Sequence, residues 1–367
     1  MTPADLSRTV VRAVRCAVEG GELGAGAVVP ERVVVERTRP GGVGEYATPV
    51  ALQLAKASGR RPAEVADLLA RRLGRVAGIR HVEITGPGFL NFSLSDDGDG
   101  DGDGAAGAGA GAREVVRLVR ARGAAYGFAD SADLPAPVDR PGTDAAADQD
   151  LRTRAVREAV GRLLRSQGVP DDARLLRVAP VARADGDVVR RYGADASRWG
   201  MLATDPAQPP HFGPVLLVQG EASEFFRVRY AVARARALVR NAAQLGFAPA
   251  TDDPATDYPA TDYPATDDPT PAGATPARTP TTKPLLDALR EYPLVLEAAA
   301  HHRAPERLAR HLVALADALL DFQYDVLPRG DEKPSAAHRS RLALADAAGT
   351  VLAGGLTLLG VDIPEVV

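Results

Sequence analysis

The chain has 367 residues, of which 45% are hydrophobic and 25% are charged, as in a globular protein of two or three domains. The single cysteine, Cys16, excludes an intramolecular disulfide and a cysteine metal cluster. The longest uncharged stretch near the C-terminus, 347–361, is too short to span a bilayer. Asp5 and Arg8 lie where a signal peptide needs an apolar run, so we expect a cytoplasmic protein with no membrane partner.

The charge is unevenly distributed along the chain, although the net charge is −4. Residues 1–95 carry 13 basic and 9 acidic side chains, and residues 151–250 carry 16 basic and 9 acidic ones. The acidic excess is concentrated in 96–150 and 251–282, which overlap the predicted linkers. The segments that are predicted to fold are therefore positive in sum, which is compatible with a polyanionic partner.

Residues 1–94 are predicted to form a compact α+β domain. Apolar side chains recur at helical spacing in two segments, and two later segments alternate as strands do. The expected elements are a helix over 6–18, a strand over 33–35, a helix opened by Pro62, and strands over 81–85 and 89–94 around the turn Gly86-Pro87-Gly88.

Two segments are predicted to be linkers. Residues 95–112 alternate Asp or Ala with Gly, so no face can be buried and the segment is expected to be flexible. A calcium loop is the alternative, but its terminal Glu is missing. Residues 249–282 repeat Pro-Ala-Thr-Asp and contain eight prolines, which predicts an extended, disordered insert.

The remaining segments are predicted from their apolar stripes. Residues 113–221 are expected to be mixed α/β, with an amphipathic helix over 152–167. A long helix is expected over 222–245, stopped by Gly246. Residues 284–367 are expected to form a helical bundle whose two stripes are Leu308, Leu312, Leu315, Leu319 and Phe322, and Leu342, Leu352, Leu356 and Leu359.

The sequence offers little for catalysis. No phosphate-binding loop, H-E-x-x-H or G-x-S-x-G motif is present. His301 and His302 are expected to form a surface pair and His211 to lie in a loop, while His311 is expected to be solvated or to face an anion. No catalytic residue, metal site or cofactor is therefore predicted.

The helix over 222–245 carries the most informative cluster. Arg227, Tyr230 and Arg234 are three and four residues apart, so they share one helical face. Two guanidinium groups around an aromatic ring suit an unstacked RNA base and its phosphates. The alternative is a solvated arginine-rich face with Tyr230 packed in the core, and the pattern alone leaves both open.

Two segments of the first domain resemble the N-terminal tRNA-binding domain of arginyl-tRNA synthetases. Gly44-Glu-Tyr-Ala-Thr-Pro-Val-Ala-Leu52 is similar to the family's G-D-Y-A-T-N-V-A-L, with Glu45 and Pro49 as departures. Gly86-Pro-Gly-Phe-Leu-Asn-Phe92 is similar to its G-P-G-F-[IL]-N-F. The resemblance implies contact between this domain and the D-loop side of a tRNA.

Later segments resemble the same family in the same order. Arg191-Tyr-Gly-Ala-Asp-Ala-Ser-Arg-Trp199 is similar to R-[YF]-G-A-D-A-L-R-[YF], and Arg229-Tyr-Ala-Val-Ala-Arg234 is similar to Q-Y-A-H-A-R with Val232 in place of His. Segments 308–312 and 322–325 resemble the helical anticodon-binding domain called DALR. The resemblance implies tRNA contacts by Tyr46, Arg227, Tyr230, Arg234, Arg310, Phe322, Tyr324 and Asp325.

The catalytic centre of that family has no counterpart. Neither an H-I-G-H nor a K-M-S-K-S sequence is present, and 113–221 is interpreted as a shortened remnant before a DALR-like domain at 222–367, which the insert 249–282 interrupts. The resemblance then implies a protein that binds tRNA, specifically an arginine tRNA and no DNA, without aminoacylating it. The alternatives are an ATP-dependent arginine–tRNA ligase, and a protein-interaction subunit whose RNA surface has decayed.

Overall fold

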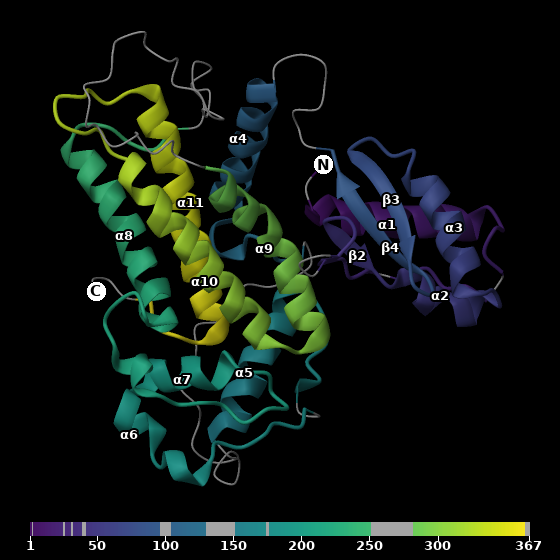
Figure 1. Ribbon diagram of the computed structural model, residues 1–367, viewed down its shortest axis with the longest axis horizontal. Coiled ribbons are helices and arrows are strands. Elements are labelled where there is room, and N and C mark those ends of the chain that lie inside the picture. The colour runs from purple at the N-terminus through teal and green to yellow at the C-terminus, as the bar shows by residue number, and fades with distance from the viewer. Residues whose placement is uncertain are drawn as a thin grey trace, which may run out of the picture. The chain divides into compact units, whose positions relative to one another are not determined.

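The computed structural model describes residues 1, 3–24, 26–30, 32–38, 42–95, 104–129, 151–173, 176–250 and 282–363. The chain forms two compact units (Figure 1). Unit 1 comprises Met1–Gly104 and Pro293–Ala298, and unit 2 comprises Ala105–Tyr292 and Ala299–Val367. Most of the Asp/Gly segment and the Pro-Ala-Thr-Asp repeat, both predicted as linkers, lies outside the described residues.

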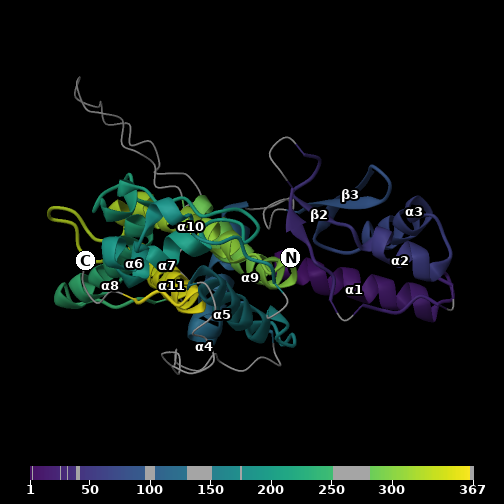
Figure 2. The same cartoon turned by 90° about the horizontal axis from the view of Figure 1, so that it is seen from below.

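Unit 1 is an α+β fold, as predicted. Its four strands form one antiparallel sheet in the order β1-β2-β4-β3. Figure 2 shows α1, α2 and α3 on one side of this sheet. The elements are α1 Pro3–Glu19, β1 Glu36–Arg37, β2 Tyr46–Thr48, α2 Val50–Ser58, α3 Pro62–Leu73, β3 Ile79–Thr85 and β4 Phe89–Leu94.

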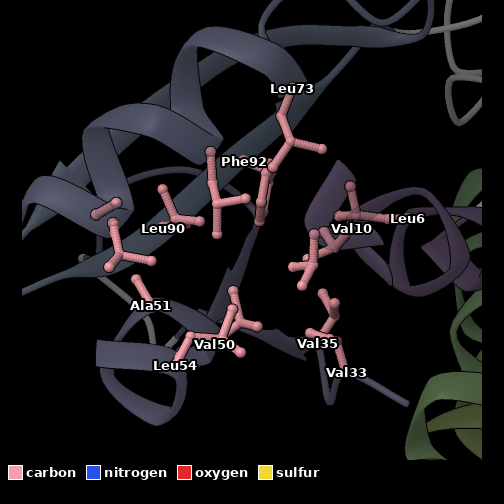
Figure 3. Close-up of a cluster of buried hydrophobic side chains, with 14 of the residues drawn as sticks. Leu6, Val10, Val33, Val35, Val50, Ala51, Leu54, Leu73, Leu90 and Phe92 are labelled. Atoms are coloured by element: carbon pink, nitrogen blue, oxygen red, sulfur yellow. The ribbon is translucent and has the colours of Figure 1, made fainter. Parts of the chain in front are cut away.

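The core of unit 1 lies between these helices and the sheet (Figure 3). Leu6 and Val10 of α1 meet Leu73 of α3, together with Leu90 and Phe92 of β4, all of them fully buried. Each buried leucine or phenylalanine contributes roughly 1.5–3 kcal/mol, so this cluster stabilises the unit. The predicted helices over 6–18 and from Pro62 are confirmed, as are the strands over 81–85 and 89–94.

The strand predicted over 33–35 is displaced. Val33 and Val35 are buried at 1% exposure, but strand pairing begins at β1, Glu36–Arg37. The reason is that side-chain hydroxyls take the backbone carbonyls there. Ser7 Oγ donates to the Val33 carbonyl at 2.5 Å, and Thr48 Oγ1 donates to the Val34 carbonyl at 2.8 Å. The alternation of apolar residues therefore predicts the burial of Val33 and Val35 correctly, but it predicts the position of the strand incorrectly.

The two motif segments of unit 1 pair with each other. Tyr46 lies opposite Phe92, and Thr48 lies opposite Leu90. Gly44 has φ +70°, and a Cβ atom there would lie 2.9 Å from the carbonyl oxygen of Phe92, so glycine is required at this position. The motifs thus specify how β2 joins β4.

The predicted flexible segment 95–112 is partly helical. Helix α4 spans Gly104–Arg122, and Ala112, Val115 and Val119 are essentially inaccessible. The apolar face of residues 113–122 starts a stable helix, and alanine, the strongest helix former, extends it toward the N-terminus despite the interspersed glycines.

The segment 113–221 was predicted to be mixed α/β. Within its described part, 113–129, 151–173 and 176–221, the structure contains helices and loops without a strand. The elements are the C-terminal part of α4, η1 Gly123–Ala125, α5 Leu151–Ser166, η3 Arg183–Asp185, α6 Val188–Tyr192, α7 Ala194–Leu202 and η4 Pro214–Leu217.

The buried side chain of Arg152 organises the loops of this segment instead of a sheet. It is fully inaccessible and donates to the carbonyls of Ala179, Met201, Thr204, Asp205 and Gln208. Backbone carbonyls that strands would have paired are therefore satisfied by one guanidinium.

The rest of unit 2 is helical, as predicted. Helices α8 Glu224–Gln244, α9 Lys283–His302, α10 Pro305–Phe322 and α11 Ala336–Leu359 are present, with the turn η5 Gln323–Asp325 after α10. Small residues of α11 permit close packing, because a Cβ at Gly349 would lie 2.6 Å from Cβ of Ala235 in α8. A Cβ at Gly355 would lie 2.5 Å from Leu312 in α10.

Helix α9 contains Pro293, which cannot donate a hydrogen bond to the Leu289 carbonyl one turn earlier. The hydroxyl of Tyr126 in unit 2 donates to that carbonyl at 3.1 Å. The ring of Tyr126 also stacks on Tyr292, with ring centroids 6.1 Å apart. A tyrosine far away in the sequence thus replaces the missing backbone donor.

The segment Arg191–Trp199 also has a packing role. Gly193, with φ +82°, separates α6 from α7. Trp199 is 2% exposed and contacts Phe225 of α8, while Arg198 pairs with Glu158 of α5 at 2.9 Å. This motif therefore joins α5, α7 and α8.

Candidate RNA-binding surface

Helix α8 presents one face to solvent and one to the core of unit 2. Ser223 caps its N-terminus, with Oγ accepting from the backbone of Phe226 at 3.3 Å. The core-facing residues are Phe225, Val228, Ala231, Val232, Ala235, Leu238 and Ala242. Val232, which replaces the histidine of the resembling family, is 1% exposed, so this difference changes the core rather than the surface.

Tyr230 lies on the exposed face of α8. It is 37% exposed, and its ring stacks on Phe226 with centroids 5.6 Å apart and planes 11° apart. Of the two readings of the helix, the one that packed Tyr230 in the core is wrong. The ring has one face against Phe226, and its exposed part can meet a ligand.

Arg227 is held by one carboxylate and one backbone carbonyl. Its Nε lies 2.9 Å from Asp317 Oδ1, and its Nη1 donates to the Glu221 carbonyl at 2.8 Å. Burial raises the pKa of Asp317 and Arg227 lowers it, while the charges of Asp321 and Glu224 raise it again. The ion pair with Asp317 thus offsets part of the charge of Arg227 and reduces its capacity to bind phosphate. Its contact with RNA stays a prediction.

Arg234 connects α8 to the end of α10. Its Nε donates to Gln323 Oε1 at 2.6 Å, and Gln323 Nε2 donates to the Leu320 carbonyl at 2.7 Å. Gln323 opens η5, the turn that carries Tyr324. Arg234 therefore positions a turn, which its spacing along α8 could not reveal.

Tyr324 is the most exposed aromatic side chain among the described residues, at 62%. Arg329 Nε donates to the Tyr324 carbonyl at 3.0 Å, and its Nη2 donates to Asp325 Oδ1 at 2.9 Å. Arg341 Nη1 donates to the Asp325 carbonyl at 3.2 Å. Sequence reasoning missed Arg329 and Arg341, since neither is at helical spacing from Tyr324.

Two residues predicted to contact RNA have their rings in the core, and their contact with RNA stays a prediction. Tyr46 on β2 is 6% exposed and belongs to the core cluster of unit 1. Phe322 at the end of α10 is 2% exposed. Both were assigned from motif position, and aromatic residues are recurrent in cores as well as at interfaces. Arg310 is exposed, and Asp325 is partly buried beneath Arg329.

The histidines differ in environment. His301 and His302 are exposed with their rings edge to face, and His211 is exposed in a loop, as expected. His311 is expected to be solvated or to face an anion, but its Nε2 is buried without a hydrogen-bond partner, and its ring contacts Tyr292. Burial lowers the pKa of His311 to about 4, although a hydrogen bond with the Ala288 backbone opposes the shift.

Among the residues that the structure describes, no three His, Cys, Asp or Glu side chains are placed to hold a metal ion. Helix α11 has 24 residues and is apolar enough to cross a bilayer, so the uncharged stretch 347–361 understated its length. However, 78% of its most apolar window is buried inside the unit, as in a core helix.

Two protein-family models match this chain. The family model described as the arginyl tRNA synthetase N terminal domain matches residues 6–94. The model described as the DALR anticodon binding domain matches residues 228–367. The chain is related to arginyl-tRNA synthetases through these two domains. Unit 1 thus contains the match to the N-terminal domain, and α8 to α11 lie almost entirely within the match to the DALR domain.

Curated relatives agree on the family. The chain is 46% identical over 129 residues to the arginine–tRNA ligase of Frankia alni and 44% identical over 128 residues to that of Kineococcus radiotolerans. Each match covers 35% of this chain and 21% of the relative, so the chain spans about a fifth of their length. A Thermus thermophilus arginyl-tRNA synthetase structure aligns over 100% of both chains with TM-score 0.45 and 14% identity.

Proposed function

We propose that this protein binds an arginine tRNA through its DALR domain and does not aminoacylate it. The observation that carries the proposal is Tyr324, an aromatic ring 62% exposed on a turn of a domain whose family binds anticodons. Unpaired anticodon bases can stack on such a ring, and stacking contributes about 1–3 kcal/mol per base. Tyr230 offers a second exposed ring on α8.

Charge supports the same partner. Residues 151–250 carry seven more basic than acidic side chains, 16 against 9, and residues 1–95 carry four more, 13 against 9. Arg60 and Arg71 on and beside α3 are exposed, so unit 1 can add contacts to the tRNA backbone away from the anticodon. Binding of this kind needs no cofactor and suits the cytoplasm, where we propose that the protein acts.

A ligase activity is the competing function, and the names of the curated relatives favour it. Against it, the sequence contains neither an H-I-G-H nor a K-M-S-K-S motif, whose histidine and lysine would stabilise the transferring phosphate. ATP–pyrophosphate exchange with arginine and tRNA separates the two. Exchange at background supports the binding protein, and exchange at the rate of a control ligase contradicts it.

A protein-interaction subunit is the third candidate, favoured by one surface feature. The turn η4 and its flank expose Val215, Leu217 and Val218 at 44%, 54% and 43%. Sequencing of the RNA that co-purifies with the full-length protein tests this candidate. Enrichment of arginine tRNAs supports the proposal, and absence of any enriched tRNA supports the interaction subunit.

A further inference from the structure

The turn η5 is held by three arginines from three different elements. Arg234 of α8 binds the side chain of Gln323, and Arg329 from the loop before α11 binds the Tyr324 carbonyl. Arg341 of α11 binds the Asp325 carbonyl. Each of the three residues of η5 thus accepts from at least one guanidinium, and Asp325 accepts from two, while Tyr324 remains 62% exposed.

A short turn such as η5 does not need this many hydrogen bonds from arginines outside it. A three-residue turn normally leaves its carbonyls to water, and an exposed tyrosine needs no fixed backbone. Arginine is suited to this task because its planar fork binds two acceptors in fixed geometry. Arg329 illustrates this, since Nε and Nη2 reach the Tyr324 carbonyl while Nη2 also reaches Asp325.

Two of these arginines have contacts that limit a direct bond to phosphate. Arg329 is paired with Asp325 at 2.9 Å, which offsets part of its charge, and Arg341 is 8% exposed, which leaves little of its side chain to a ligand. Their contribution to RNA binding would then come through the backbone they hold. A ring that is fixed before binding loses less conformational freedom when a base stacks on it.

We propose that Arg234, Arg329 and Arg341 are positioning residues that hold η5 so that Tyr324 forms a preformed stacking platform for an unpaired RNA base. The inference rests on the proposed function for its ligand, and on the three sets of hydrogen bonds for its geometry. Arg329 is the member to test, since it is 63% exposed in its side chain and its replacement leaves the core intact.

The test compares full-length Tyr324→Ala, Arg329→Gln and the double variant. The probe is a synthetic anticodon stem-loop of an arginine tRNA, titrated over a range of salt concentrations. Tyr324→Ala is expected to weaken binding about fivefold to 150-fold. Arg329→Gln is expected to weaken it about threefold to tenfold with an unchanged salt slope, and to have no further effect when Tyr324 is already alanine.

A direct phosphate contact predicts different numbers. Loss of such a contact lowers the slope of log affinity against log salt by roughly one and adds to the effect of Tyr324→Ala. That result would overturn the positioning role. Arg339→Gln is the matched control, because Arg339 is an exposed arginine on the first turn of α11 with no side-chain bond to η5 among those described.

Hydrogen exchange of the RNA-free protein separates this inference from the proposed function. Arg329→Gln is expected to accelerate exchange at the Val326 amide, which donates to the Gln323 carbonyl, while Arg339→Gln leaves it unchanged. Suppose that exchange is accelerated in Arg329→Gln but the wild type does not bind the stem-loop. Arg329 would then hold η5 as inferred, and the proposed RNA function would be refuted. Unchanged exchange in Arg329→Gln would refute the inference that Arg329 holds η5.

Discussion

Tyr46 in unit 1 is 6% exposed, whereas Tyr324 in unit 2 is 62% exposed, although the family resemblance assigned both to RNA contact. Tyr46 lies on β2, where its motif pairs with the motif of β4 and closes the sheet. Tyr324 lies on a turn whose backbone is bound by arginines from outside the turn. The comparison teaches that the motif tyrosine in a strand contributes to the core, whereas the motif tyrosine on a turn held by arginines lies at the surface.

The largest expected effect concerns Tyr46, the buried tyrosine of this comparison. Tyr46→Ala removes a buried ring from unit 1 and should cost roughly 3–5 kcal/mol of folding free energy, because a cavity remains. Chemical denaturation of the full chain measures this, with Tyr46→Phe as the control that keeps the ring. If Tyr46→Ala instead preserved stability and weakened RNA binding, the core assignment would be wrong.

The same contrast is available within three residues of unit 2. Phe322→Ala should destabilise the unit by about 3–5 kcal/mol, because Phe322 is 2% exposed. Tyr324→Ala should change the folding free energy by no more than about 0.5 kcal/mol, because its ring is at the surface. Thermal melting of both variants decides the matter, and equal losses would contradict the division between core and platform.

Acid should affect unit 2 through His311. Its pKa of about 4 lies below the ordinary 6.5, so the unfolded chain takes up the proton first as the pH falls. The stabilisation is complete above about pH 6.5 and is lost toward pH 4, by as much as about 3 kcal/mol. The measurement is the free energy of unfolding against pH for the wild type and His311→Leu.

His311→Leu should flatten that dependence over the same window. Burial raises the pKa of Asp346 and Glu306, which favours their protonated forms in the folded state and gives a slope of opposite sign. Both carboxyl groups remain in the variant, so the difference between the two profiles isolates the histidine. Identical profiles would contradict the burial of His311 and favour the solvated histidine that was one of the two alternatives from the sequence.

The smallest expected effect concerns two stacked tyrosines of unit 2. Tyr126→Phe removes the donor to the Leu289 carbonyl and should cost about 1 kcal/mol. Tyr292→Phe should be neutral or stabilising, because the Tyr292 hydroxyl is buried without a partner. Denaturation of the two variants side by side gives the comparison, and a reversed order would mean that another group satisfies Tyr292.

Local rules predicted the elements whose residues lie close together in sequence. The helix opened by Pro62 and the strands around Gly86-Pro87-Gly88 follow from capping and alternation, and both are present. The leucine stripes of α10 and α11 are buried as expected. The candidate surface was predicted less well: Tyr230 and Tyr324 are exposed, but Tyr46 and Phe322 are not, because burial depends on neighbours far away in sequence.

The sequence by itself determined the resemblance of the two domains to a known family, the presence of several helices and the aromatic residues worth testing, because these depend on ordered motifs and on periodicity. Only the tertiary structure decided which side chains face solvent and which guanidinium meets which acceptor. Arg152 and Arg329 are the same residue type in the sequence. In the structure Arg152 is inaccessible among loop carbonyls, whereas Arg329 holds an exposed turn. The physical reason is that the partner of an arginine is set by elements that meet only after folding.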